Sequence, residues 1–184
     1  YSDGPDPAAM VRELKNMGIH LMVSVWPTVD RDSENYEEMV ELGFLTRSEC
    51  GKRIGQLGDE ACLIDVTNPD GRAYVWEKIR KNYYEKGIRI FWLDEAEPEF
   101  TGYEFQNYRF FRGADMEVGN IYPKEYARMV YEGMEAQGQK QIVNLLRCAW
   151  AGSQRYGALV WSGDIDSSFR SLRNQLAAGL NMGI

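Results

Sequence analysis

The residues from Ile88 to Glu99 constrain the fold more than any other stretch of this chain. A short apolar run rich in Ile, Phe and Trp follows Gly87 and ends in acidic residues, which is typical of a buried parallel strand. Asp94 stands at the carboxyl end of that strand. Trp92 lies two residues earlier, so strand geometry puts its ring on the same side as Asp94. An indole ring beside a carboxylate suits the binding of a sugar.

The stretch from Ala158 to Asp164 repeats this design, with a tryptophan closing an apolar run and an aspartate three residues after it. Retaining hydrolysis of a glycosidic bond needs two carboxyl groups about 5 Å apart. One attacks the anomeric carbon, and the other moves a proton to and from oxygen. We therefore interpret the two aspartates, Asp94 and Asp164, as a glycosidase pair.

Arg147 follows a third expected strand, 141–146, and so belongs to the same end of the sheet. A guanidinium at that place favours an ionised carboxylate nearby, which makes Asp94 the expected nucleophile. Asp164 follows a Ser-Gly turn that can lift it off the sheet. A carboxyl group with less charge compensation suits the general acid/base, which is the role expected of Asp164.

These residues also have structural interpretations. Trp92 and Trp161 are core residues by default, and a buried Arg147 can pair with a structural carboxylate. Asp166 is an alternative to Asp164, although its place just before a serine is typical of a helix N-terminus.

The acidic residues after Asp94 and the single histidine have mainly structural interpretations. Glu95, Glu97 and Glu99 are more often a solvated acidic turn than ligands. His20 precedes its expected strand, at the end opposite the aspartates, so we expect a structural role for it.

Helical and strand patterns alternate along the chain. Capping residues and apolar stripes predict helices that begin near Pro7, Asn35, Asn68, Pro123 and Ser167. Strands are predicted over 20–26, 88–93, 141–146 and 158–161, and another is expected to begin at 182–184. This alternation implies an α/β fold with a parallel sheet and right-handed crossovers.

The length of the chain limits how much of a barrel it can form. A complete (β/α)₈ TIM barrel takes about 250 residues, whereas this chain has 184 and about four to five expected parallel strands. We expect residues 1–184 to be a single catalytic barrel segment from a larger catalytic domain. The less regular stretch 28–66, with a glycine-rich region from Gly51 to Gly58, is expected to be a loop insertion after the first strand.

Composition narrows the choice of partners. The net charge is −7, which argues against nucleic acid, and no apolar run is long enough to cross a membrane. The three cysteines lack the spacing of a disulfide framework or a metal site. We expect no cofactor and a cytoplasmic location. The open strand edges of a partial barrel favour a homo-oligomer or contact with the remainder of the barrel.

The stretch Phe91 to Glu99 resembles the nucleophile block of glycoside hydrolase family 31, with Asp94 on the nucleophile position. Trp161-Ser-Gly-Asp164 is similar to the block that carries the general acid/base. Arg147 matches the arginine that contacts the sugar in the −1 subsite. The stretch from Asp6 through Pro27 looks like the third barrel strand of the family and the helix before it.

The resemblance implies a retaining exo-α-glycosidase on a (β/α)₈ barrel, without metal, that acts on an oligosaccharide or small glycoside. Trp26, Trp92, Arg147 and Trp161 are the residues expected to bind the substrate. The Glu-Ala-Glu-Pro after Asp94 looks more like the α-xylosidase branches of the family, so the expected substrate is a terminal α-xyloside or α-glucoside.

Two other interpretations stay open. In the first, a barrel enzyme binds a divalent metal ion through Asp94, Glu97, Asp164 and Asp166. In the second, the chain is a barrel fragment that folds or binds carbohydrate but catalyses nothing alone.

Overall fold

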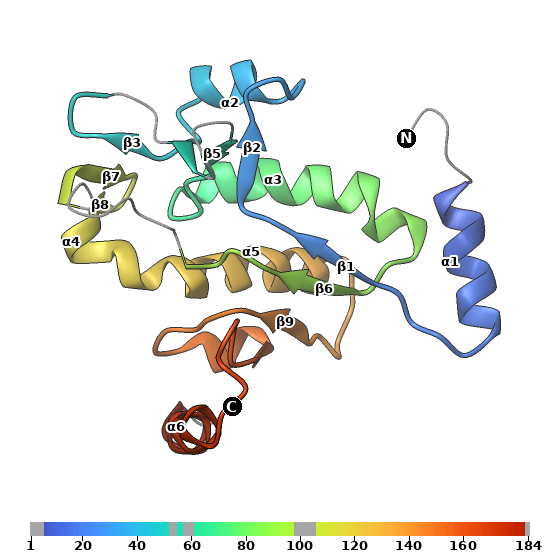
Figure 1. The fold of residues 1–184 in the computed structure, drawn as a ribbon. Helices are drawn as coiled ribbons and strands as arrows, with labels where there is room; N and C mark the ends of the chain where they lie inside the picture. The colour runs from blue at the N-terminus through green and yellow to red at the C-terminus, as the bar shows by residue number, and fades with distance from the viewer. Residues whose placement is uncertain (1–5, 52–54, 57–60, 98–105, 183–184) are drawn as a thin grey trace.

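The computed structural model describes residues 6–51, 55–56, 61–97 and 106–182 (Figure 1). Its centre is a four-stranded parallel sheet in the order β1-β6-β9-β10. These strands are β1 (Met22–Val25), β6 (Ile90–Leu93), β9 (Asn144–Leu146) and β10 (Ala158–Val160). Each strand pairs with the next one of the sheet in parallel, in chain order, as adjacent strands of a barrel wall do. The four strands predicted from the sequence are confirmed.

Strand β6 lies between β1 and β9 in the sheet, and this inner position explains its apolar sequence. Phe91 and Leu93 are fully buried and belong to the hydrophobic core. Ile90 and Trp92 alternate with them and are only partly buried. The strand therefore packs one face against helices and turns Trp92 toward the other face, which faces the interior in a closed barrel.

Two long helices cover the packed face of the sheet, α3 (Pro69–Asn82) and α5 (Tyr122–Ala136) (Figure 1). The Asn68 side chain caps α3 by accepting from the amides of Asp70 and Gly71 at 3.0 and 3.4 Å. In α5, side chains four residues apart are fully buried: Tyr122, Tyr126, Val130 and Met134. The apolar stripes predicted in these two helices thus pack in the core.

Two outer helices flank this body, α1 (Pro7–Asn16) and α6 (Phe169–Met182). Asp6 caps α1 through the amide of Ala8, as the sequence predicts. No residue of α6 is buried, although its apolar stripe is present.

The connection from β9 to β10 contains the 3₁₀ helix η4 (Ser153–Tyr156) instead of an α-helix, so the alternation of strand and helix is interrupted once. The strand expected at 182–184 lies largely outside the described residues, and Met182 ends α6.

The stretch 28–66 has more regular structure than the predicted loop insertion. It contains β2 (Thr28–Asp30), α2 (Tyr36–Glu41), β3 (Arg47–Ser48), β4 (Gly55–Gln56) and β5 (Ala61–Leu63). Strands β2, β5 and β4 form one small antiparallel sheet. Strand β3 forms another with β7 (Tyr108–Phe110) and β8 (Gly113–Ala114). Each of these strands has two or three residues, too few to show a period of two in the sequence. Much of the glycine-rich region Gly51 to Gly58 lies outside the described residues.

The described residues also include three short helical elements, η1 (Tyr84–Lys86), α4 (Asp115–Val118) and η3 (Gly119–Ile121). Asp65 links the segment after β5 to the turn that follows β7. Its carboxylate accepts from the Thr67 amide at 3.0 Å, the Thr67 hydroxyl at 2.6 Å and the Phe111 amide at 2.6 Å. Burial raises the pKa of Asp65, and these hydrogen bonds oppose that rise.

Within the described ranges, no helix has both the length and the apolarity to cross a membrane.

Candidate active site

Arg147 lies at the centre of a cluster of four carboxylates at the carboxyl ends of the central strands. Its Nη2 is 2.9 Å from Oδ2 of Asp164, and its Nη1 is 3.6 Å from Oδ1 of Asp94. The same Nη1 is 3.7 Å from Oε1 of Glu95, and Nε donates to Glu97. One guanidinium therefore links the two aspartates that the sequence predicts as a catalytic pair.

Backbone hydrogen bonds that extend the parallel sheet bring these residues together. The amides of Asp94, Arg147 and Trp161 donate to the carbonyls of Val25, Leu93 and Leu146, at 3.1, 3.4 and 3.2 Å respectively. Each donor comes just after its own strand, and each acceptor ends the neighbouring strand. The side chains beyond the strand ends consequently meet at one edge, where parallel α/β sheets carry their functional groups.

The two aspartates have different surroundings. The Asp94 side chain is 11% exposed, whereas the Asp164 side chain is 82% exposed. Oδ1 of Asp94 is buried and has no hydrogen-bond partner among the described residues. Gly163, with φ of 71°, gives the turn that carries Asp164 off the sheet, as the sequence suggests.

Trp92 and Trp161 lie together beside this cluster. Their rings pack edge to face, with centroids 5.4 Å apart and an interplanar angle of 79°. Nε1 of Trp92 is buried and lacks a hydrogen-bond partner within the part of the chain that the structure describes. The two predicted sugar-binding indoles therefore contact each other and do not enter the main hydrophobic core.

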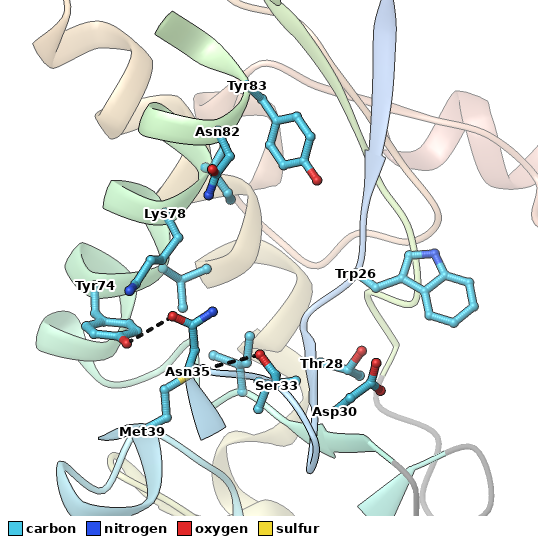
Figure 2. Close-up of a pocket in the computed structure, with 14 residues that line it drawn as sticks. Trp26, Thr28, Asp30, Ser33, Asn35, Met39, Tyr74, Lys78, Asn82 and Tyr83 are labelled. Carbon is cyan, nitrogen blue, oxygen red and sulfur yellow. Dashed lines mark hydrogen bonds between the residues drawn. The ribbon is translucent and has the colours of Figure 1, made fainter. Parts of the chain in front are cut away.

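Trp26 occupies a different place. It follows β1, and 43% of its surface is exposed. It lies at the edge of a cavity of about 260 Å³ between α3 and the segment that starts β2. Figure 2 shows its ring turned away from the Tyr74, Lys78 and Asn82 side chains on the far wall of that cavity. Neither aspartate of the pair lines this cavity, so it is separate from the Arg147 cluster.

The charges of the cluster affect the titration of nearby groups. Burial acts to lower the pKa of Arg147, but its contacts with Glu97 and Asp164 outweigh burial and raise that pKa. Burial, together with the charge of Glu97, raises the pKa of the Cys148 thiol to about 12. Cys148 is therefore protonated at neutral pH and is unsuited to act as a nucleophile. Burial, with the charge of Asp94, also raises the pKa of Tyr126, which donates to the Val25 carbonyl at 2.7 Å.

The structure corrects the interpretation of the acidic turn. Glu95 is buried, with a side chain only 10% exposed, and it faces Arg147 instead of solvent. Glu97 is partly exposed but binds the same guanidinium. Glu99 lies outside the described residues. The spacing of acidic residues after a strand does not reveal which of them fold back over it, so no sequence pattern separates Glu95 from its neighbours.

The remaining candidates are placed as follows. Among the ion pairs of the described residues, Arg147 contacts Asp164 and not Asp166. His20 is exposed and precedes β1, at the end of the sheet opposite the cluster. Among the described residues, no three His, Cys, Asp or Glu side chains are grouped so as to hold a metal ion.

A parallel sheet in chain order, with charged groups gathered at its carboxyl edge, is the arrangement seen in the wall of a (β/α)₈ barrel. The model of the glycosyl hydrolases family 31 TIM-barrel domain matches residues 3–184, and the chain belongs to that family. The family resemblance and the expected fold, an α/β segment of a TIM barrel, are both confirmed.

Glucosidases and α-xylosidases are among the relatives of this chain. The uncharacterized family 31 glucosidase ORF2 of Pseudescherichia vulneris is 54% identical over 183 residues, which are 99% of this chain and 35% of that protein. An α-xylosidase of Saccharolobus solfataricus is 34% identical over 189 residues, covering 100% of this chain and 24% of that protein.

A solved structure agrees with this assignment. The crystal structure of a family 31 α-xylosidase from a soil metagenome, complexed with xylose, superposes with a TM-score of 0.91 at 62% identity. The match covers 97% of this chain and 27% of that one. The chain thus spans about a quarter to a third of the length of the proteins that it matches.

Proposed function

We propose that the protein containing this chain is a retaining exo-α-glycosidase that removes terminal α-xylosyl or α-glucosyl residues from oligosaccharides or small glycosides. The observation that carries the proposal is the contact of one guanidinium, that of Arg147, with both Asp94 and Asp164. The names of the relatives, glucosidase and α-xylosidase, support the same reaction class.

Asp94 is the proposed nucleophile. Its Oδ1 is buried and has no hydrogen-bond partner among the described residues, so its lone pairs remain available to attack the anomeric carbon. Attack forms a glycosyl ester with Asp94 while the bond to the leaving oxygen breaks. Arg147 offsets the charge of the carboxylate without donating a close hydrogen bond to it, because the distance to Nη1 is 3.6 Å.

Asp164 is the proposed general acid/base. Its exposed side chain can reach both a leaving-group oxygen and an incoming water molecule. It first gives its proton to the leaving oxygen and then removes a proton from the water that cleaves the ester, which restores both aspartates.

The substrate is proposed to bind against Trp92, Trp161 and Arg147. Trp26, which directly follows the neighbouring strand β1, is a further proposed contact. The indole pair offers an apolar surface for a pyranose ring, and Arg147 offers donors for its hydroxyl groups. The similarity to a structure complexed with xylose supports an α-xyloside as the substrate, and the glucosidase name of another relative supports an α-glucoside.

The domain assignment remains part of the proposal. We infer that residues 1–184 form one catalytic barrel segment, and that 28–66 is an insertion beside the carboxyl edge of the sheet. The exposed apolar stripe on α6 supports a partner surface in the remainder of the barrel or in a second copy.

The nucleophile assignment is tested with the complete protein and the two substrates 4-nitrophenyl α-xyloside and 4-nitrophenyl α-glucoside. We expect Asp94→Asn to lower kcat/KM by about 10⁴-fold or more, because a nucleophile is lost. Asp32→Asn, which changes an exposed aspartate in the same way, is the matched control and should leave activity unchanged. A wild type that releases no nitrophenol from either glycoside contradicts the proposal and favours a non-catalytic role.

The general acid is tested with leaving groups of different quality. We expect Asp164→Ala to lose most of its turnover on an oligosaccharide, whose leaving group needs a proton, but much less on a 4-nitrophenyl glycoside. Equal losses on the two substrates would show that Asp164 is not the acid, and the same measurement on Asp166→Ala then tests the alternative.

A further inference from the structure

The Val25 carbonyl joins the backbone of the proposed nucleophile to helix α5. Val25 ends β1, and its carbonyl oxygen accepts from the Asp94 amide at 3.1 Å. The same oxygen accepts from the hydroxyl group of Tyr126 at 2.7 Å. A backbone carbonyl has two lone pairs, so it can accept both hydrogen bonds at once. One shared acceptor therefore links the Tyr126 hydroxyl to the amide of Asp94.

Tyr126 reaches this acceptor from the helix that supports the sheet. Its side chain comes from α5, is fully buried and belongs to the hydrophobic core. Burial raises the pKa of Tyr126, and the charge of Asp94 adds to that rise because the two groups lie close together. The phenol group is thus placed where a change in it is felt at Asp94.

The side chain of Asp94 is not tightly fixed by its own contacts. Oδ1 has no hydrogen-bond partner among the described residues, and the nearest approach of Arg147 to it is 3.6 Å. Asp94 also comes directly after Leu93, the last paired residue of β6. Because a contact of 3.6 Å is too long for a hydrogen bond, the place of Oδ1 depends mainly on where the backbone of Asp94 is held.

Tyr122 offers a comparison within the same helix. It lies one turn before Tyr126 on α5, is also fully buried, and its hydroxyl also donates at 2.7 Å to a backbone carbonyl. That carbonyl belongs to Ile64, which follows β5 and is not part of the central sheet. The two tyrosines therefore make the same kind of bond, but the acceptor of Tyr126 is the one that also holds Asp94.

We propose that Tyr126 is a positioning residue for the nucleophile. Its hydroxyl fixes the Val25 carbonyl, which fixes the Asp94 amide, and the carboxylate of Asp94 is thereby held at the distance from the anomeric carbon that attack requires. Because Tyr126 is fully buried, it acts through Asp94 and not on the substrate directly. The inference rests on the proposed function, because it concerns the group that attacks the glycoside in that reaction.

The test removes one hydroxyl group at a time from the complete protein. Tyr126→Phe and Tyr122→Phe each keep the buried ring and lose one hydrogen bond to a carbonyl, so we expect similar falls in the midpoint of thermal unfolding. The activity assay is hydrolysis of the 4-nitrophenyl glycoside that the wild type cleaves faster.

We expect kcat to fall by about 10- to 100-fold in Tyr126→Phe, because a slightly misplaced reacting group costs rate on this scale, and by less than about twofold in Tyr122→Phe. KM should stay nearly the same in both variants, because the groups proposed to bind the sugar are unchanged. Equal falls of kcat in the two variants overturn the inference, and so does a loss in Tyr126→Phe that lies in KM alone. A much lower thermal midpoint for Tyr126→Phe than for Tyr122→Phe assigns Tyr126 a structural role and overturns it as well.

A wild type that hydrolyses neither 4-nitrophenyl glycoside overturns the proposed function instead. The hold of Tyr126 on Asp94 is then tested by hydrogen exchange of the peptide that contains Asp94, measured by mass spectrometry. Exchange should be faster in Tyr126→Phe than in Tyr122→Phe, since the end of β1 is released from α5. Equal exchange in the two variants overturns the inference.

Discussion

At the scale of single residues, the planar fork of Arg147 explains how distant parts of the sequence meet. Its three nitrogen atoms point in fixed directions, so each can face a different carboxylate: Nε faces Glu97, Nη1 faces Asp94 and Nη2 faces Asp164. An ammonium group has one nitrogen on a flexible stem and cannot reproduce this arrangement.

We therefore expect Arg147→Lys to lower kcat/KM by about 100-fold, the cost expected when a positioning contact is lost, although the charge is kept. Steady-state kinetics on a 4-nitrophenyl glycoside measure the change. Arg155→Lys, at an exposed position of η4, is the control and should behave as the wild type. Full activity in Arg147→Lys would mean that only the charge of Arg147 matters.

The sequence predicted the placement of Asp94 and Arg147 because strand ends can be recognised from apolar runs that stop at polar residues. It could not place Glu95, whose position depends on a left-handed turn that no pattern of apolar and polar residues encodes. Nor could it show that Trp92 and Trp161 pack on each other. That contact depends on the register in which β6 pairs with β9 and β9 pairs with β10.

At the scale of elements, one buried carboxylate joins the two helices that support the sheet. The Glu125 side chain on α5 is 2% exposed and lies 3.1 Å from Nη1 of Arg72 on α3. Arg112 and Arg128 each approach it to 3.5 Å, and Lys124 to 4.0 Å. Arg72 also donates to the Val66 carbonyl at 2.8 Å, and burial lowers its pKa against the opposing effect of Glu125.

Glu125→Gln should be strongly destabilising, by about 3–5 kcal/mol, because it leaves the partly buried Arg72 charge without its partner. The midpoint of thermal unfolding of the complete protein measures this loss. Glu132→Gln removes a pair with Arg128 in which the Glu132 side chain is 48% exposed, and we expect it to cost less than about 1 kcal/mol. Similar midpoints for the two variants would show that the buried cluster is not a stabilising element.

The sequence predicted best the helices that are marked by capping residues or by a regular spacing of apolar side chains. Asn68 and Pro69 mark the start of α3, and the four-residue spacing of apolar side chains marks the buried face of α5. The small antiparallel sheets were not predicted, because their pairing joins segments far apart, such as Arg47 with Arg109. Such pairing follows from tertiary contacts and not from local propensity.

At the scale of the whole molecule, the sheet and α6 both have surfaces that the described residues leave uncovered. The apolar stripe of α6 consists of Phe169, Leu172, Leu176 and Leu180, which are 90%, 64%, 64% and 77% exposed. The chain covers about a quarter to a third of the length of its relatives. A continuous stripe of this kind marks a contact surface, because isolated apolar residues are common on protein surfaces but grouped ones are not.

If the remainder of a barrel covers this stripe in the complete protein, a charge placed on it has opposite effects in two settings. Leu176→Lys should lower the thermal midpoint of the complete protein, because a lysine replaces a buried leucine at a cost of about 2–5 kcal/mol. In residues 1–184 produced alone, the same change should reduce self-association, measured by light scattering, because it interrupts the exposed apolar stripe. Arg173→Lys, a conservative change at an exposed position of the same helix, is the control for both measurements. An unchanged midpoint in the complete protein would mean that α6 faces solvent there too, and that the barrel closes through other contacts.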